Sequence, residues 1–344
     1  MKTWIEFVRE AQGRRSPQAP NGDFDNVRRE ELRRLSEYTV RNLVIYVVDF
    51  LDPGRQKAPG ALSIELSDKL GFIEVLRRLE GPAVDILIES PGGSAEATEA
   101  LVTLLRQKFT DVRFIVPNVA KSAATMMAMS ANVLILDEPS ELGPIDPQFI
   151  FRREGNPVVS PAHAILQQFE WATNDIKDNP DHLPAWMPIL NQYGPSLLVE
   201  CHAAIALAQR LVTGWLERYM FGGEPDCRKK ARRIARFLSA YDEHLSHRRA
   251  VGMGQLQQQG VKILSMNSDP KLKERIWDVY NSILATFVGT GAFKLFENHL
   301  GDCYVSMAAT IPIAIGLPQM IPQPVPARPV PSPAPPAAPT EPGN

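Results

Sequence analysis

Apolar and polar positions in the first half of the chain follow a repeating strand and helix pattern. Short runs of apolar and β-branched residues predict strands over 43–48, 85–89, 112–116 and 133–136. Between them, apolar residues at helical spacing predict helices over 64–79, 95–105 and 120–129. This alternation is typical of a mainly parallel sheet with crossover helices, so the sequence predicts an α/β fold.

The second half is mostly helical, and the chain ends in a different composition. Helical spacing recurs over 162–171 and 196–219, with a proline-rich connection over 180–195 between them. From Pro318 onward prolines are too frequent for a helix or a strand ladder, which predicts an extended, disordered tail that acts as an inert linker. We therefore expect an N-terminal helical arm over 1–35, a main domain over 36–312 that includes a helical region over 161–238, and a tail over 313–344.

Two turns in this pattern carry candidate chemistry. The first expected strand-to-helix turn is Ser90-Pro91-Gly92-Gly93, followed by Ser94 as the helix cap. Glycines at such a turn let the backbone approach a ligand and leave N–H groups free for an anion. These are the components of an oxyanion hole.

The second turn places a hydroxyl at a helix start. Ser122 follows the strand over 112–116 and is flanked by the small residues Ala123 and Ala124, so a substrate can reach it. A serine at this position is ordinarily just a cap, but the glycine turn before it and the rigid loop around Asp146 after it favour a nucleophile. Asp146 lies between Pro144 and Pro147.

These segments resemble a known family. Ser-Pro-Gly-Gly-Ser from Ser90, Ala-Lys-Ser-Ala-Ala-Thr-Met-Met-Ala-Met from Ala120 and Glu-Leu-Gly-Pro-Ile-Asp-Pro-Gln from Glu141 resemble the Clp-protease/crotonase superfamily, in its branch of serine dehydrogenase proteinases, which is signal peptide peptidase-like. The resemblance extends from about Arg41 to about Met307. It implies a Clp/crotonase-like fold and a serine peptidase that cleaves peptide bonds through an acyl-enzyme.

The resemblance also implies a catalytic set in the order Ser, Asp, His. It assigns Ser122 as nucleophile, Asp146 as the orienting carboxylate and a later histidine as base, with the oxyanion hole at Gly92, Gly93 and Ala123. It further implies peptide or protein substrates, no cofactor or metal, and self-association in which the helical region over 161–238 covers the site or joins subunits.

The base and the carboxylate each leave alternatives open. The spacing of His244 and His247 places both on one face if a helix extends that far, and the resemblance makes His247 the preferred base and His244 the second choice. Asp137 competes with Asp146 for the carboxylate role. His163 and His202 are expected to be structural because they lie in apolar helices, and a Ser-Lys pair is the other option for the base, with candidates Lys121, Lys177 and Lys262.

Composition limits the remaining function classes. A net charge of −2 gives no general electrostatic reason to bind nucleic acid or an anionic membrane, and the basic run over 228–233 is expected to be a solvated helix face. Three scattered cysteines predict neither a disulfide framework nor a zinc site, and no apolar run is expected to span a membrane. We expect a cytoplasmic protein, with two alternatives to the peptidase: a non-catalytic binding or scaffold protein, and a crotonase-like acyl-CoA enzyme.

Overall fold

The computed structural model describes residues 1–54, 59–153 and 156–308 of the 344-residue chain. These residues fall within one unit, Met1–Ala309, and the tail expected over 313–344 lies outside them. The strands are Asn42–Val48 (β1), Ala83–Glu89 (β2), Asp111–Val116 (β3), Val119–Ala120 (β4), Val133–Leu136 (β5), Glu141–Leu142 (β6), Gln148–Arg153 (β7), Asn156–Pro161 (β8), Val251–Gly252 (β9), Ile263–Ser265 (β10), Ala292–Asn298 (β11) and Cys303–Met307 (β12).

The α-helices are Trp4–Gly13 (α1), Phe24–Thr39 (α2), Pro59–Leu62 (α3), Asp68–Leu76 (α4), Ala95–Lys108 (α5), Ala123–Ala128 (α6), Ala162–Asp178 (α7), Leu183–Leu190 (α8), Leu197–Trp215 (α9), Cys227–Ser239 (α10), Tyr241–His244 (α11), Met253–Gln258 (α12) and Pro270–Gly289 (α13). Two short 3-10 helices are Pro180–His182 (η2) and Met266–Ser268 (η4), and a π-helical turn, Leu216–Met220 (η3), extends α9.

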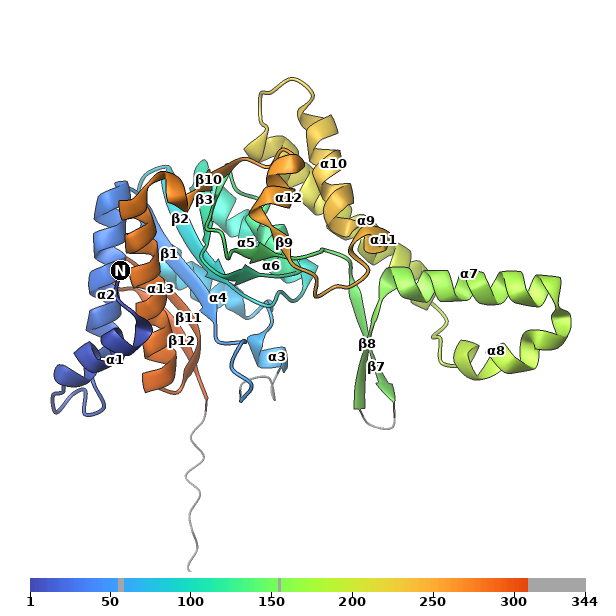
Figure 1. Ribbon diagram of the computed structural model, residues 1–344, viewed down its shortest axis with the longest axis horizontal. Coiled ribbons are helices and arrows are strands. Elements are labelled where there is room, and N and C mark those ends of the chain that lie inside the picture. The colour runs from blue at the N-terminus through green and yellow to red at the C-terminus, as the bar shows by residue number, and fades with distance from the viewer. Residues whose placement is uncertain (55–58, 154–155, 309–344) are drawn as a thin grey trace, which may run out of the picture. The chain divides into compact units, whose positions relative to one another are not determined.

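A seven-stranded sheet forms the centre, in the order β10-β5-β3-β2-β1-β11-β12 (Figure 1). Its first five strands are parallel, whereas β11 and β12 add at one edge as antiparallel strands. The expected α/β fold with a mainly parallel sheet is therefore confirmed. The antiparallel strands β11 and β12 were not predicted.

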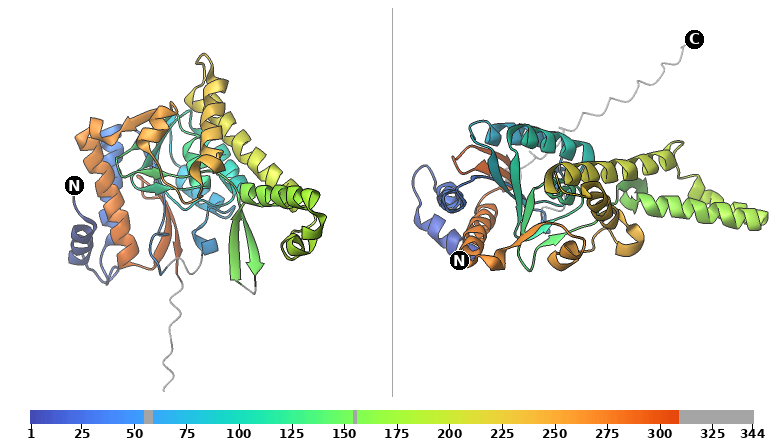
Figure 2. Two further views of the ribbon diagram at one scale, coloured as in Figure 1. Left: turned by 45° about the vertical axis from the view of Figure 1, so that its right-hand side comes forward. Right: turned by 90° about the horizontal axis from the view of Figure 1, so that it is seen from above.

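Both faces of the sheet are covered, as the alternation of side chains along β1 requires. Leu43, Ile45 and Val47 join the apolar cluster that α2 and α13 complete on one face. Val44 and Tyr46 point to the opposite face, where the cluster continues into α4, α5, α6, α9 and α10. Figure 2 shows α2 and α13 beside one another, on the other side of the sheet from α5.

Tertiary contacts changed several expected helices. Residues 64–67 are not helical, because Ile64 pairs with Gly93 and the helix begins only at Asp68. The connection expected over 180–195 contains η2 and α8. The helix expected to carry His244 and His247 on one face ends at His244, because Leu245 adopts a left-handed conformation with φ of 57°.

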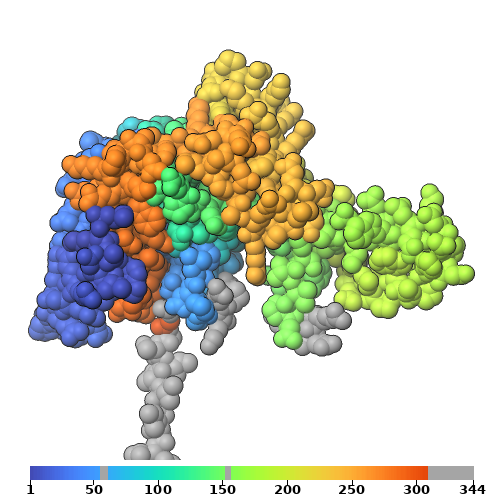
Figure 3. All heavy atoms as spheres, viewed as in Figure 1, coloured from blue at the N-terminus to red at the C-terminus, as the bar shows by residue number. Residues whose placement is uncertain are grey.

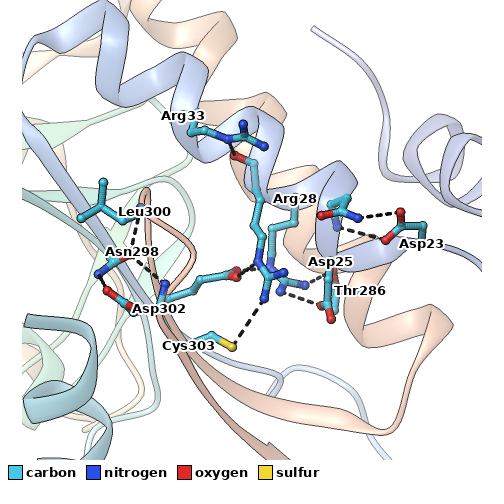
Figure 4. Close-up of polar contacts among 12 residues, drawn as sticks. Asp23, Asp25, Arg28, Arg33, Thr286, Asn298, Leu300, Asp302 and Cys303 are labelled. Carbon is cyan, nitrogen blue, oxygen red and sulfur yellow. Dashed lines mark hydrogen bonds and ion pairs between the residues drawn. The ribbon is translucent and has the colours of Figure 1, made fainter. Parts of the chain in front are cut away.

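The N-terminal helices, which include the arm expected over 1–35, are attached to the sheet by a buried ion pair. Arg28 on α2 is fully buried, and its Nε donates to Glu297 Oε2 on β11 over 2.5 Å. Its other nitrogens donate to Thr286 Oγ1 and Asp25 Oδ1, each over 2.8 Å (Figure 4). Glu297 is also fully buried, and removing Arg28 would leave it paired only with the partly exposed Arg29.

A two-stranded hairpin, β7 and β8, and the helices α7 and α8 extend away from the rest of the described residues (Figure 3). No residue of α8 is buried, although its sequence is almost entirely apolar, and Trp171 on α7 is 59% exposed. The next helix, α9 with its π-helical turn, covers Leu197–Met220 and is long and apolar enough to cross a membrane by length and composition alone. That finding corrects the expectation that no apolar segment is long enough to span a membrane, although core helices of soluble proteins also reach this length and apolarity.

Candidate active site

The glycine turn follows β2 at the carboxyl edge of the parallel strands. Ser94 caps α5 by accepting the Ala97 N–H at 3.0 Å, as the sequence predicted. Upstream, the Ile64 N–H donates to the Gly92 carbonyl over 2.7 Å, and the Ser94 N–H donates to the Ile64 carbonyl over 2.9 Å. The turn is thus held from one side by the segment around Ile64.

This pairing leaves the N–H of Gly93 directed away from Ile64. In a parallel bridge, the residue whose neighbours make both hydrogen bonds turns its own N–H and carbonyl to the opposite side. The Gly92 N–H is engaged with Ser90 Oγ at 3.2 Å, whereas no partner of the Gly93 N–H occurs within the described residues. A Cβ at Gly93 would lie 2.3 Å from the Ile64 carbonyl oxygen, so only glycine fits.

Ser122 occupies a strained turn between β4 and α6. Its φ of 51° and ψ of −120° are unusual for a residue with a side chain, and such strain clusters at functional sites. Its side chain makes no capping hydrogen bond, which removes the ordinary explanation for a serine at a helix start.

The two turns touch. A Cβ added at Gly92, where φ is 98°, would lie 2.7 Å from Ser122 Cβ and 2.9 Å from the Ala123 nitrogen. Ala123 is the first residue of α6, and its N–H is among the groups that the helix itself cannot satisfy. The structure therefore places Gly92, Ser122 and the start of α6 in direct contact, with the Gly93 N–H on the next residue.

Asp146 and His247 meet across 101 residues of sequence. His247 Nδ1 lies 2.7 Å from Asp146 Oδ1, and because an ionised carboxylate only accepts hydrogen bonds, Nδ1 is the donor. The other carboxylate oxygen, Oδ2, accepts the Gln148 Nε2 at 2.8 Å. Asp146 is 1% exposed, whereas the His247 side chain is 21% exposed and so remains open to a ligand.

Ser122 and His247 line the same cavity, of about 430 Å³, together with Gly92 and Gly93. The rest of the wall is largely apolar and comes from α6, α9 and the hairpin; it includes Met126, Ile145, Ile150, Val159, Ala204, Leu207 and Ala208. A polar end that holds a hydroxyl and an imidazole beside an apolar wall is the usual composition of a substrate pocket.

His244 is directed elsewhere. It is buried, its Nε2 lies 2.8 Å from the Phe237 carbonyl oxygen, and its ring packs edge-on against Phe237. The reversal of the backbone at Leu245 separates it from His247. Of the two candidate histidines, the geometry thus brings His247, and not His244, to Asp146.

The other competitors also have partners of their own. Asp137 accepts hydrogen bonds from Lys273 Nζ at 2.7 Å and from Trp277 Nε1 at 2.8 Å, and these contacts hold its pKa below the ordinary value despite burial. Lys121 Nζ donates to Glu141 Oε2 at 2.8 Å. Of the remaining lysines, Lys262 pairs with Glu224, and Lys177 lies exposed on α7.

The remaining histidines lie away from the cavity. His163 stacks on Tyr241, and His182 contacts Asp175. His299 Nδ1 accepts the Leu43 N–H at 3.3 Å, and burial lowers the pKa of His299. His202 is exposed on α9.

Sequence reasoning did not single out Gln148 or Glu89. Gln148 stands two residues after Asp146, and its amide is the kind of donor that a buried carboxylate requires. Glu89, directly before the glycine turn, is 2% exposed, and burial raises its pKa to about 7. An acidic residue at the end of a mainly apolar strand, directly before the glycine turn, was the available signal for Glu89.

Comparison with known proteins covers part of this site. Residues 61–181, about a third of the chain, match the family model described as ClpP-like SDH-type serine proteinase. The resemblance to the serine dehydrogenase proteinase branch is confirmed over this segment. The matched segment contains the glycine turn, Ser122 and Asp146, whereas His247 lies outside it.

Two curated relatives are uncharacterized proteins of Methanocaldococcus jannaschii. MJ0137 is 35% identical over 79 residues, and MJ1495 is 33% identical over 79 residues. The matches cover 22% of this chain in each case, and 28% and 27% of the relatives. This chain therefore spans less than a third of the length of either relative.

Two solved structures are mutants of a membrane-bound stomatin-specific protease, the second in complex with a substrate peptide. The first is 15% identical, with a TM-score of 0.36 over 62% of this chain and 79% of the other. The second is 17% identical, with a TM-score of 0.35 over 59% and 71%. TM-scores this low do not establish a shared topology. The ClpP-like assignment is supported by the family match and by the parallel sheet with its crossover helices.

Proposed function

We propose that this protein is a serine peptidase in which Ser122 is the nucleophile, His247 the base and Asp146 the carboxylate that orients it. The observation that carries the proposal is the hydrogen-bonded Asp146 and His247 pair, whose imidazole lines one cavity with the strained Ser122. Since Nδ1 donates to Asp146, the other ring nitrogen, Nε2, has its lone pair available to receive a proton.

The chemistry would proceed by acyl transfer. Nε2 takes the proton of the Ser122 hydroxyl as Oγ attacks the scissile carbonyl carbon, and the imidazolium then protonates the leaving amine as the carbon–nitrogen bond breaks. His247 Nε2 then takes a proton from water as the water attacks the acyl carbon, and it returns that proton to Ser122 Oγ as the ester bond breaks. No hydrogen bond between Ser122 Oγ and His247 is present within the described residues. The proposal therefore requires that this hydrogen bond forms when substrate binds in the cavity.

The oxyanion hole would consist of the Gly93 and Ala123 N–H groups, with Gly92 providing the close approach between them. The Gly92 N–H is already used by Ser90, so its contribution is its missing side chain. Two backbone donors at a helix start can stabilise the negative charge that develops on the carbonyl oxygen.

A crotonase-like acyl-CoA enzyme is the less favoured alternative. Such an enzyme needs cations for the phosphates of CoA, but the cavity lining includes two glutamates, Glu65 and Glu96, and no arginine or lysine among the described residues. The apolar wall fits an uncharged side chain of a peptide substrate better than it fits a polyanion.

The test is covalent labelling by a fluorophosphonate, compared between the wild-type protein, Ser122→Ala and His247→Ala. We expect the wild-type protein to label, Ser122→Ala not to label, and His247→Ala to label at least a hundredfold more slowly, in line with general-base catalysis. Ser130→Ala is the matched control, because this buried serine donates only to the Met127 carbonyl. A folded wild-type protein that does not label would refute the peptidase and favour a binding protein, and turnover of acyl-CoA that survives Ser122→Ala would favour the crotonase-like enzyme.

Self-association and cytoplasmic location remain proposals. Self-association is supported by the exposed apolar residues of α7 and α8, which include Trp171, Leu183 and Met187. Light scattering after size-exclusion chromatography of the wild-type protein and of Trp171→Glu would test it, since an interface through α7 predicts a smaller particle for the variant. Cell fractionation would test the location, and recovery in the membrane fraction would instead favour a role for the Leu197–Met220 helix.

A further inference from the structure

Glu89 is a buried carboxyl group between the two halves of the candidate active site. It is the last residue of β2, is 2% exposed and stands directly before the turn that carries Gly92 and Gly93. Within the described residues, no lysine, arginine or histidine forms an ion pair with it. A buried carboxyl group without a cation is costly, so its presence calls for an explanation.

The backbone around Glu89 connects the glycine turn to the nucleophile. The Ser90 N–H donates to the Val119 carbonyl over 3.3 Å, and the Lys121 N–H donates to the Ser90 carbonyl over 3.0 Å. Val119 and Ala120 form β4, which leads into Ser122 within two residues. The distance between the glycine turn and Ser122 therefore depends on how β4 lies against the end of β2.

The side chain of Glu89 secures the same junction. Its carboxylate is linked to Asn118, the residue directly before β4, through the Tyr280 hydroxyl. The Tyr280 hydroxyl on α13 donates to Oε2 over 2.7 Å, and the Asn118 amide donates to Tyr280 Oη over 3.0 Å. The Tyr280 hydroxyl is thus a donor to Glu89, which is the kind of partner that an ionised carboxylate requires.

Two charge states of Glu89 are accessible near neutral pH. Burial raises its pKa to about 7, the donor groups of Tyr280, Asn118 and Val119 act in the opposite direction, and the nearby Asp49 raises the pKa further. When the carboxyl is protonated, its O–H faces these donors and one of their hydrogen bonds loses its acceptor. The Ser122 turn, with its unfavourable φ of 51°, is held only by its surroundings and is sensitive to such a loss.

We propose that Glu89 is a positioning residue for Ser122: its carboxylate holds β4 against the glycine turn, so that loss of the negative charge slows acylation of Ser122. The inference rests on the proposed nucleophile. It assigns Glu89 no contact with substrate and no part in proton transfer.

The experiment measures the rate of fluorophosphonate labelling between pH 5 and pH 8 for the wild-type protein and Glu89→Gln. A misplaced nucleophile typically costs between tenfold and a hundredfold in rate, so we expect the wild-type protein to label about tenfold faster than the variant at pH 8. At pH 5, where the wild-type carboxyl is protonated, the two rates should nearly converge. The amide variant resembles the protonated acid in charge and shape, and any effect of acidification on groups other than Glu89 is common to both proteins.

Two further variants separate positioning from stability. Tyr280→Phe retains the carboxyl group but removes a hydrogen bond to its charged form, so the pH at which its labelling rate falls should move upward relative to the wild-type protein. Asp85→Asn is the matched control. Asp85 is a fully buried carboxylate toward the other end of β2, paired with Arg41 and Arg113 away from the cavity. The ratio of the wild-type labelling rate to the Asp85→Asn labelling rate should therefore not vary with pH.

The outcomes are distinct. A ratio of wild-type to Glu89→Gln rates that stays constant from pH 5 to pH 8 would overturn the positioning role, even if both proteins label. A wild-type protein that labels at no pH would instead refute the nucleophile itself. A Glu89→Gln protein that does not fold would leave Tyr280→Phe to decide, because an unshifted pH dependence there also overturns the inference.

Discussion

Replacing Glu89 with glutamine should make the stability of this protein less dependent on pH. The folded state raises the pKa of Glu89 from 4.5 to about 7, chiefly through burial. A shift of that size corresponds to about 3 kcal/mol, at about 1.4 kcal/mol for each pKa unit. The perturbation removes the charge while keeping a side chain of nearly the same volume.

The sign follows from proton binding. Between about pH 4.5 and pH 7, the folded protein keeps a proton on Glu89 that the unfolded chain releases, so unfolding becomes easier as pH rises. The cost to the folded state is absent below pH 4.5 and complete above pH 7. The unfolding free energy of Glu89→Gln minus that of the wild-type protein should therefore increase by about 2 to 3 kcal/mol as the pH rises from 5 to 8.

The assay is urea unfolding followed by tryptophan fluorescence at pH 5, 6, 7 and 8 for both proteins. Every other titrating group is common to the pair, so the difference between their unfolding free energies isolates Glu89. Any stability that the variant loses because the glutamine amide makes poorer hydrogen bonds is the same at every pH, so it does not change how the difference varies with pH. If the difference changes by less than about 0.5 kcal/mol across the range, the reasoning about burial is refuted.

Three other substitutions test the site and its support. Gly92→Ala should reduce fluorophosphonate labelling at least a hundredfold, because the new Cβ would lie 2.7 Å from Ser122 Cβ; labelling at the wild-type rate would show that the turns need not touch. Gln148→Leu removes the donor to Asp146 Oδ2 and should slow labelling about tenfold, whereas Gln148→Glu should slow it more by placing a second carboxylate there. Arg28→Met should lower the unfolding free energy by about 3 kcal/mol in urea unfolding, and Arg28→Met combined with Glu297→Leu should recover part of that loss, which a merely additive effect would contradict.

Local patterns predicted much of the parallel sheet because strands and crossover helices are read from neighbouring residues. The strand expected over 43–48 is β1, and Ser94 caps α5 as expected. The helix expected over 64–79 was too long because Ile64 pairs with Gly93, a contact that helical spacing cannot reveal. The strands β11 and β12 escaped prediction because polar residues interrupt their apolar runs, which weakens the strand pattern.

The candidate site was less predictable than the sheet, because the aspartate and the histidine that belong to it are decided by contacts between residues far apart in sequence. The sequence favoured Asp146 but left Asp137 open, because the partners that engage Asp137, Lys273 and Trp277, lie far along the chain. The resemblance favoured His247 as the base, but the sequence could not show whether His247, His244 or neither approaches Asp146.

The choice between the two histidines depends on a single backbone conformation. Had the helix that starts at Tyr241 continued, His244 and His247 would have shared a face, and both could have approached Asp146. The left-handed conformation of Leu245 ends that helix and directs the two rings apart, one toward the Phe237 carbonyl and the other toward Asp146. Leucine rarely adopts this conformation, so its side-chain type does not announce the reversal, and the cost must be offset by the contacts that follow. The hydrogen bond from His247 to the buried Asp146 is one such contact, which suggests that the strain at Leu245 and the geometry of the proposed base are maintained together.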